Sequence, residues 1–314
     1  MLEHPLQRFF HSMRAKRPFD WVRFQRRDLL LIDHPLCQAV FSRQGAQLLH
    51  FQPQGERPLL WCASEWPALS SAPVRGGIPV CWPWFGDLAR NPQAIRNQYA
   101  GTQSAPFHGL VRAIDWQVVT SGCEADAATI ELTCAAAAAG ELPGWPHRVE
   151  VTLRIRLGEA LEVSLSSRNL DDHPVSISQA LHSYLATADI HQTRVAGLDA
   201  CPYVDTLADW QNHEQQGDLR FHGETDRIYL ALADTLTLVD TAGRRSLQLR
   251  STGSRSAILW NPWIEKSKRL SQFATDAWQR MLCIETANVL DDARRLAPGE
   301  CHTLGVRFLA NSQA

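Results

Sequence analysis

The sequence lacks the features that mark membrane, secreted and nucleic-acid-binding proteins. Its longest near-apolar stretch, residues 134–140, is mostly alanine and far too short to span a bilayer. The chain opens without a basic segment followed by an apolar run, so we expect no secretory signal and no membrane anchor. Lys plus Arg number 31 against 33 for Asp plus Glu, a formal net charge of −2. Without a basic surplus, neither nucleic acid nor an anionic membrane is expected as a partner.

Motifs for metal ions and nucleotides are also missing. The eight cysteines are scattered singly, with no CxxC pair and no short Cys/His spacing. This usage predicts free thiols in a reducing compartment, by default the cytoplasm, and no metal site. There is no GxGxxG and no P-loop, so we expect no cofactor of the nucleotide type, nor any other.

The sequence does contain ample material for a packed core built from strands. With 45% apolar and 20% charged side chains, it is neither disordered nor collagen-like nor a coiled coil. Polarity alternates over residues 148–157 and again, after the turn-prone Gly158, over residues 161–170, which predicts an antiparallel pair. Further strands are expected at residues 29–32, 46–51, 116–120, 129–133, 175–185, 235–239, 246–249, 256–260, 281–286 and 302–309.

These elements predict an all-β, mostly antiparallel, many-stranded sandwich. Helical periodicity is confined to residues 5–16 and 271–280. No Gly/Ser- or Pro-rich linker divides the chain, so we expect one domain over residues 1–314, with residues 1–27 as a partly helical N-terminal extension. We expect this domain to act as a monomer.

The densest candidate site is the segment of residues 73–86. Arg75 is followed by Gly76 and Gly77, which would let the backbone approach a ligand closely, and then by Trp82, Trp84 and Phe85. Aromatic faces beside a fixed cation suit a sugar or a sugar phosphate. The alternative for the tryptophans is a rigid aromatic corner of the core.

A histidine and an arginine occur together in residues 106–112. If this segment is extended, His108, Leu110 and Arg112 project to the same side, so that an imidazole and a guanidinium line one surface. The alternative for His108, which precedes a glycine, is a turn or a hydrogen-bonded core position.

Two strands carry an ionisable group where an apolar one is expected. In residues 175–185, one face holds Ser176, Ser178, Ala180, His182 and Tyr184, a set of small and hydroxyl side chains around an imidazole that fits the floor of a cleft. In residues 281–288, Glu285 interrupts an apolar strand, where burial would raise its pKa and its basicity. The alternative to a site role for His182 is a strand face exposed to solvent. The alternative for Glu285 is a structural salt bridge.

Asp226 gives a weaker signal, in the segment Glu224-Thr225-Asp226-Arg227-Ile228-Tyr229. Its carboxylate could accept hydrogen bonds from sugar hydroxyls, and it could equally cap a turn.

Taken together, these stretches resemble the hexose-6-phosphate mutarotases, or glucose-6-phosphate 1-epimerases, of the aldose 1-epimerase superfamily. The resemblance covers roughly residues 28–309 and follows the family order. It rests on Arg75-Gly76-Gly77-Ile78-Pro79 with the aromatic segment behind it, His108-Gly109-Leu110-Val111-Arg112, Leu181-His182-Ser183-Tyr184, the Asp226 segment, and Glu285-Thr286-Ala287-Asn288 followed by Leu296-Ala297-Pro298-Gly299-Glu300.

The resemblance implies a β-supersandwich of the galactose-mutarotase type that interconverts the α and β anomers of an aldohexose 6-phosphate. It implies that His182 is the general acid at the ring oxygen and Glu285 the general base at the anomeric hydroxyl. Arg75, Arg112 and Asp226 are similar to ligand-binding positions of the phosphate-preferring branch, and His108 to a substrate-contacting histidine of free-sugar epimerases. Phe107 departs from the polar Gln of several relatives.

Two other functions stay open at this point. A mutarotase of free aldoses would use the same acid and base, although a neutral sugar has no anion to offset two guanidinium groups. A non-catalytic sugar-binding protein of the same fold would need the aromatic and arginine residues but not the acid/base pair.

Overall fold

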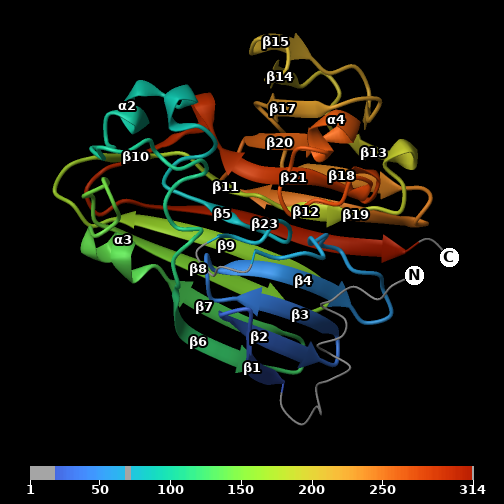
Figure 1. Ribbon diagram of the computed structural model, residues 1–314, viewed down its shortest axis with the longest axis horizontal. Coiled ribbons are helices and arrows are strands. Elements are labelled where there is room, and N and C mark those ends of the chain that lie inside the picture. The colour runs from blue at the N-terminus through green and yellow to red at the C-terminus, as the bar shows by residue number, and fades with distance from the viewer. Residues whose placement is uncertain (1–17, 68–71, 313–314) are drawn as a thin grey trace.

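Antiparallel strands are the main regular structure in the computed structural model, which describes residues 18–67 and 72–312 (Figure 1). The first sheet has four strands in chain order, β1-β2-β3-β4. Their bounds are Phe19–Phe24, Arg27–His34, Cys37–Ser42 and Gln47–Pro53. The predicted extension, residues 1–27, thus contributes the strand β1 to this sheet. The helix expected at residues 5–16 lies outside the described residues.

Two larger sheets hold the remaining strands apart from a two-stranded pair. The nine-stranded sheet has the order β16-β13-β18-β19-β23-β9-β8-β7-β6. In chain order its strands are β6 Gln117–Cys123, β7 Ala128–Thr133, β8 Val149–Leu157, β9 Ala160–Asn169, β13 Thr193–Ala196, β16 Leu219–Arg220, β18 Thr235–Asp240, β19 Arg245–Thr252 and β23 Cys301–Ser312. In Figure 1 the long strand β23 runs between the early strands β8 and β9 and the later strands β18 and β19.

The eight-stranded sheet positions the functional site. Its order is β15-β14-β17-β20-β21-β11-β5, and β12 also pairs with β21. Its strands are β5 Val80–Cys81, β11 Gln179–Leu181, β12 Tyr184–Ala186, β14 Pro202–Asp205, β15 Gln211–Glu214, β17 Thr225–Tyr229, β20 Ser256–Asn261 and β21 Met281–Asn288; a separate pair joins β10 Val175–Ile177 to β22 Arg294–Leu296.

Helices are short and lie in the connections. The α-helices are α2 Gln93–Arg96, α3 Ala135–Ala139 and α4 Trp263–Ser267, and the 3₁₀ helices are η1 Leu88–Arg90, η2 Ile190–Gln192, η3 Ala277–Arg280 and η4 Leu290–Asp292. Within the described ranges, no helix has the length and apolar character needed to cross a bilayer.

The hairpin β8–β9 confirms the clearest sequence prediction. Every second side chain of β8, from Val149 to Leu157, is buried, and Leu157 pairs with Leu161 across the turn. These side chains belong to a core cluster that also contains Phe41 of the four-stranded sheet and Leu259 of the eight-stranded sheet. One continuous apolar core therefore joins the three sheets and offsets the chain entropy lost on folding.

The strand predicted over residues 175–185 is instead three short strands, because its pairing partner changes along the way. β10 pairs with β22, whereas β11 and β12 pair with β21. At Ser178, between β10 and β11, the backbone N–H donates to the carbonyl of Pro83, at 3.1 Å. At His182 the backbone N–H donates to the carbonyl of Pro79, at 3.0 Å. Partners outside the sheet thus break the run twice.

The helix predicted at residues 271–280 is wrong over its first half, since only Ala277–Arg280 forms a 3₁₀ turn. Gln272 has a φ of 57°, in the left-handed region, where a helix cannot continue. Its side-chain oxygen accepts from the N–H of Arg75 at 3.1 Å, and its amide donates to the carbonyl of Pro73 at 3.1 Å. Tertiary hydrogen bonds therefore override the local helical pattern.

The paired glycines Gly76 and Gly77 serve the packing of backbone on backbone and not the approach of a ligand. A Cβ on Gly77 would lie 2.0 Å from the carbonyl oxygen of Leu48, and one on Gly76 would lie 2.4 Å from the Cα of Cys62. The sequence prediction of a ligand-facing glycine pair is corrected accordingly. The alternative for Trp82 and Trp84 is confirmed, because both rings are fully buried in the core.

Candidate active site

A cavity of about 360 Å³ opens over the eight-stranded sheet. Side chains of β17, β20 and β21 line it, together with the segments around residues 85–91 and 107–112. All six residues singled out in the sequence line this one cavity: Arg75, His108, Arg112, His182, Asp226 and Glu285. Because they come from five separate segments, only the fold could bring them together.

The imidazole of His182 and the carboxyl group of Glu285 form the chemical centre of the cavity. Glu285 is in the middle of β21, and His182 follows β11, which pairs with β21. The distance from His182 Nε2 to Glu285 Oε1 is 3.3 Å, and both side chains are over 90% buried. The ring of His182 stacks on Tyr184, with centroids 4.7 Å apart and planes 9° from parallel. Stacking and backbone pairing fix the two groups in mutual contact.

Burial and the surrounding charges shift the pKa values of both groups toward their neutral forms. Burial lowers the pKa of His182 to about 3, and the positive charges of Arg112 and Arg75 act in the same direction. Burial raises the pKa of Glu285 well above its ordinary value, helped by the negative charge of Asp226 and opposed by Arg112. Two groups this close exchange protons as a pair, and without a bound anion the neutral imidazole beside a neutral carboxyl is favoured.

Glu285 and Arg112 each keep a buried atom for which no hydrogen-bond partner exists among the described residues. These atoms are Oε2 of Glu285 and Nε of Arg112. Leaving a buried polar group unpaired costs about 1–3 kcal/mol, more for a charged one. Since both side chains line the same cavity, the unpaired atoms mark positions where a polar ligand would bind.

Hydrogen bonds to residues 271 and 272 hold Arg75 in place. Its Nε donates to the carbonyl of Ser271 at 2.9 Å, and its backbone N–H is bonded to Gln272. The rest of the guanidinium is left to face the cavity, where its charge and that of Arg112 both act on His182. The cavity thus has two cations on the His182 side.

The segment around His108 is a turn and not the extended strand proposed from the sequence. His108 and Gly109 have φ values of 66° and 80°. The ring of His108 accepts from the N–H of Gly86 through Nδ1, at 3.1 Å, and lies edge-on to His182 with centroids 5.2 Å apart. Burial lowers the pKa of His108 well below its ordinary value, so it is a neutral wall of the cavity. Beside it, Phe107 is exposed at the rim.

Asp226 lies on β17 and lines the cavity beside Lys266. Its carboxylate is 3.8 Å from Nζ of Lys266, which also contacts Glu224 at 3.0 Å. Burial raises the pKa of Asp226 to about 6 despite the nearby lysine. Its carboxyl group can therefore change charge near neutral pH.

Several residues that line the cavity were not predicted from the sequence. Lys266 on α4, Arg90 on η1, and the aromatic rings of Trp210 and Trp260 line the cavity, and Arg90 lies over the Trp210 ring at 5.1 Å. Lys266, Arg90 and Trp210 stand singly in short helices or a loop, and Trp260 is one of several apolar residues on β20, so no spacing or alternation marks them as site residues. An aromatic residue near a lone cation was the one available signal, and it is common on any protein surface.

A sequence model of the family described as aldose 1-epimerase matches residues 28–309. The chain belongs to the aldose 1-epimerase family. It is therefore an epimerase, an isomerase, and the expected family is confirmed over the range that the resemblance covers.

Relatives in other organisms match most of the chain. A protein of Escherichia coli (strain K12), provisionally named a glucose-6-phosphate 1-epimerase, is 32% identical over 263 residues, 83% of this chain and 83% of that protein. A protein of Cenchrus ciliaris with the same provisional name is 31% identical over 276 residues, 84% of this chain and 78% of that protein.

Solved structures confirm the fold of this epimerase. A provisionally named mutarotase from Salmonella typhimurium matches it with a TM-score of 0.86 at 24% identity, over 99% of this chain and 100% of that one. A galactose mutarotase-like protein from Clostridium acetobutylicum matches with a TM-score of 0.71 at 12% identity, over 94% and 98% of the two chains. The fold is the galactose-mutarotase type of β-supersandwich, as the resemblance implies.

Proposed function

We propose that this epimerase interconverts the α and β anomers of an aldohexose 6-phosphate, with glucose 6-phosphate as the reference substrate. The observation that carries the proposal is the buried contact of 3.3 Å between His182 and Glu285 in a cavity that also holds two arginines. The names of the Escherichia coli and Cenchrus ciliaris relatives agree with a hexose phosphate.

The reaction needs one base and one acid. Glu285 removes the proton from the anomeric hydroxyl while His182 delivers a proton to the ring oxygen, so that the C1–O5 bond breaks and C1=O1 forms. Rotation about C1–C2 turns the other face of the aldehyde toward the ring oxygen. Ring closure then returns both protons by the reverse transfers, and the pair ends with the proton count with which it began.

The charges around the acid/base pair are compatible with the order of groups along the substrate. Arg75 and Arg112 act on His182, whereas Asp226 and Arg112 act on Glu285. In an aldohexose 6-phosphate, the phosphate is on C6, next to C5 and the ring oxygen, and O1 and O2 follow on the other side. With the phosphate on the arginines, the ring oxygen falls at His182, the anomeric hydroxyl at Glu285 and a ring hydroxyl at Asp226. His108 adds a hydrogen-bonding or stacking surface beside His182.

The phosphate would also prepare the acid. Positive charge from Arg75 and Arg112 lowers the pKa of His182. The charge of Arg112 also lowers the pKa of Glu285 and so stabilises its carboxylate. A dianion bound to both guanidinium groups offsets the positive charge of both arginines at His182, but only that of Arg112 at Glu285. The charged pair, imidazolium with carboxylate, therefore gains stability relative to the neutral pair. A free aldose brings no such charge and leaves the pair in its neutral form.

The remaining expectations fit this function. No disulfide joins any of the eight cysteines, all of which lie within the described residues, and this supports a reducing compartment such as the cytoplasm. We propose that the substrate is a small sugar phosphate, that the chain acts as a monomer, and that it uses neither nucleic acid nor a membrane as a partner.

Anomer exchange by one-dimensional exchange NMR tests the proposal, on glucose 6-phosphate and on glucose at matched concentrations. We expect the protein to accelerate the phosphate ester and to leave glucose close to its spontaneous rate. Arg75→Gln and Arg112→Gln should each raise KM for glucose 6-phosphate by about 10- to 100-fold, the loss of one charge-assisted hydrogen bond. Arg220→Gln, at an exposed position of β16 away from the cavity, is the matched control.

Each outcome has a separate meaning. Equal acceleration of both sugars would assign the protein to free aldoses and remove the role of the arginines. Acceleration of neither sugar would favour a sugar-binding protein of the same fold.

A further inference from the structure

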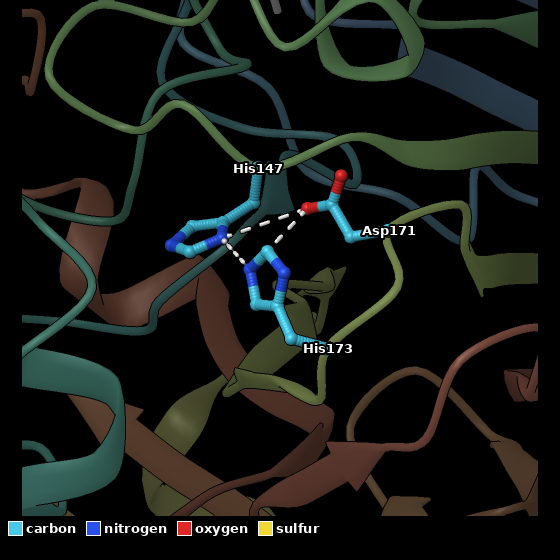
Figure 2. Close-up of side chains that lie close together, drawn as sticks. All are labelled: His147, Asp171 and His173. Atoms are coloured by element: carbon cyan, nitrogen blue, oxygen red, sulfur yellow. Dashed lines mark hydrogen bonds and ion pairs between the residues drawn. The ribbon is translucent and has the colours of Figure 1, made fainter.

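Outside the cavity, two histidines and one aspartate converge at the open end of the β8–β9 hairpin (Figure 2). His147 precedes β8, and Asp171 and His173 follow β9. The last pair of the hairpin is Val149 with Asn169, so two residues further along the same register place His147 opposite Asp171. Figure 2 shows both rings and the carboxylate directed toward one another.

The distances among the three side chains are those of a metal-ligand set. His147 Nδ1 is 3.3 Å from His173 Nε2, and each of these nitrogens is 3.7 Å from Asp171 Oδ2. A zinc ion at about 2.0–2.2 Å from nitrogen and oxygen ligands separates tetrahedral ligand atoms by about 3.3–3.6 Å. The three atoms therefore need to move by only a few tenths of an ångström to share one ion.

Each ligand group is also held by a partner outside the cluster. Asp171 accepts from the backbone N–H and from Nε of Arg148, both at 3.0 Å. His173 is bonded through Nδ1 to the carboxylate of Asp172 at 3.0 Å, which leaves Nε2 with its lone pair when the ring is neutral. His147 packs edge-on against Trp145, with ring centroids 4.9 Å apart. Partners of this kind orient metal-ligating histidines and raise metal affinity.

The loop that carries Asp171 and His173 is braced from beneath. The buried Asn169 accepts from the N–H of Asp171 at 2.9 Å and donates to the carbonyls of His173 and Leu296, at 2.8 and 3.0 Å. The ligand positions are thus set before any ion binds, which lowers the entropic cost of binding.

We propose that His147, Asp171 and His173 bind a divalent transition-metal ion of the zinc class, with a fourth position open to water. Two imidazoles and one carboxylate are a donor set that suits Zn²⁺. The ion would clip the start of β8 to the β9–β10 loop. This site departs from the sequence prediction of no metal, since His147 is 24 residues from Asp171 in the chain and the three ligands form no short Cys/His spacing.

Isothermal titration of the metal-free full chain with ZnCl₂ tests the proposal. We expect saturable binding, weakened at least about 100-fold by His147→Ala or His173→Ala, and about 10-fold by Asp172→Asn, which removes only the outer partner of His173. The exposed His222→Ala is the matched control and should bind as the wild type does. His173, more than half exposed, can be removed without opening the core.

A second zinc-competent group is formed by the cavity residues His182 and Glu285 with the buried Cys283, so binding at the two sites must be distinguished. His182→Ala should leave zinc binding at His147, Asp171 and His173 unchanged. The zinc-dependent rise in Tm should vanish in His173→Ala and persist in His182→Ala. No saturable binding by the wild type, or binding unaffected by His147→Ala and His173→Ala, would overturn the proposal.

Discussion

Asp226→Asn is expected to change how stability depends on pH. Burial raises the pKa of the folded-state carboxyl from 3.8 to about 6. The folded state then holds its proton more tightly than the unfolded state, so stability is greatest below the unfolded pKa and falls as the pH rises toward the folded one. The asparagine side chain has no proton to lose, and the variant escapes this fall.

The magnitude follows from the two pKa values. A shift of about two units corresponds to about 3 kcal/mol of stability lost once both states are ionised. Between about pH 5 and about pH 7.5, the part that changes is about 1.4 kcal/mol. The free energy of unfolding of Asp226→Asn, relative to the wild type, should rise by that amount across this range. At a urea slope of about 3 kcal/mol/M, the midpoint difference changes by about 0.5 M.

Urea denaturation followed by tryptophan fluorescence at several pH values measures this difference. Asp209→Asn is the control, because Asp209 is exposed in a turn with a φ of 51°, which asparagine also tolerates. A difference between Asp226→Asn and wild type that stays constant from about pH 5 to about pH 7.5 would refute the reasoning, since a lost contact with Lys266 cannot mimic the proton linkage.

Two further substitutions separate chemistry from packing. Glu285→Gln should slow anomer exchange on glucose 6-phosphate by about 10²- to 10⁴-fold. Its free energy of unfolding should stay within about 1 kcal/mol of the wild type, since burial favours the neutral form of the carboxyl and one of its oxygens has no hydrogen-bond partner among the described residues. The exposed Glu214→Gln is the control for exchange NMR and denaturation, and near-normal turnover in Glu285→Gln would contradict the assignment. Gly109→Ala should cost at least about 2 kcal/mol, because φ is 80° and a Cβ would lie 2.1 Å from the Trp82 carbonyl oxygen. Gly55→Ala, with φ of 76° and open space around it, should cost only about 1 kcal/mol, and equal losses in urea denaturation would exclude the clash.

The hairpin β8–β9 could be predicted because its alternation is local and continuous. Each residue of β8 from Val149 to Leu157 obeys one rule, burial on every second position, and the turn at Gly158 is also local. Residues 175–185 obey the same rule by composition, yet their partner changes from β22 to β21, and their pairing with β21 is interrupted at His182. Which strand lies beside a segment is set by the whole topology, so the breaks at Ser178 and His182 had no local signal.

The acid/base candidates could be predicted for a different reason, namely the cost that an ionisable group imposes on an apolar strand. Glu285 stands out because its neighbours on β21 are apolar or small and because burial of an unpaired carboxyl is unfavourable. Arg75 and His108 were found with it, but the conformations assumed for their segments were wrong: the Gly76–Gly77 pair packs on backbone, and His108 lies in a turn. The site residues could therefore be identified although the predicted backbone conformations were wrong. A charged or titratable side chain needs a polar partner in any backbone conformation.

The cluster of His147, Asp171 and His173 shows the converse. Each of these side chains is unremarkable where it stands, since a histidine beside a proline and an aspartate in a loop are common on surfaces. Their meeting follows from one quantity, the register of β8 on β9, which sets residue 147 opposite residue 171. Alternation predicts that two strands pair, but it does not distinguish between registers that differ by two residues. A shift of two residues would move His147 about 7 Å away from Asp171. Site chemistry that depends on register is thus the part of this protein that only its folded structure reveals.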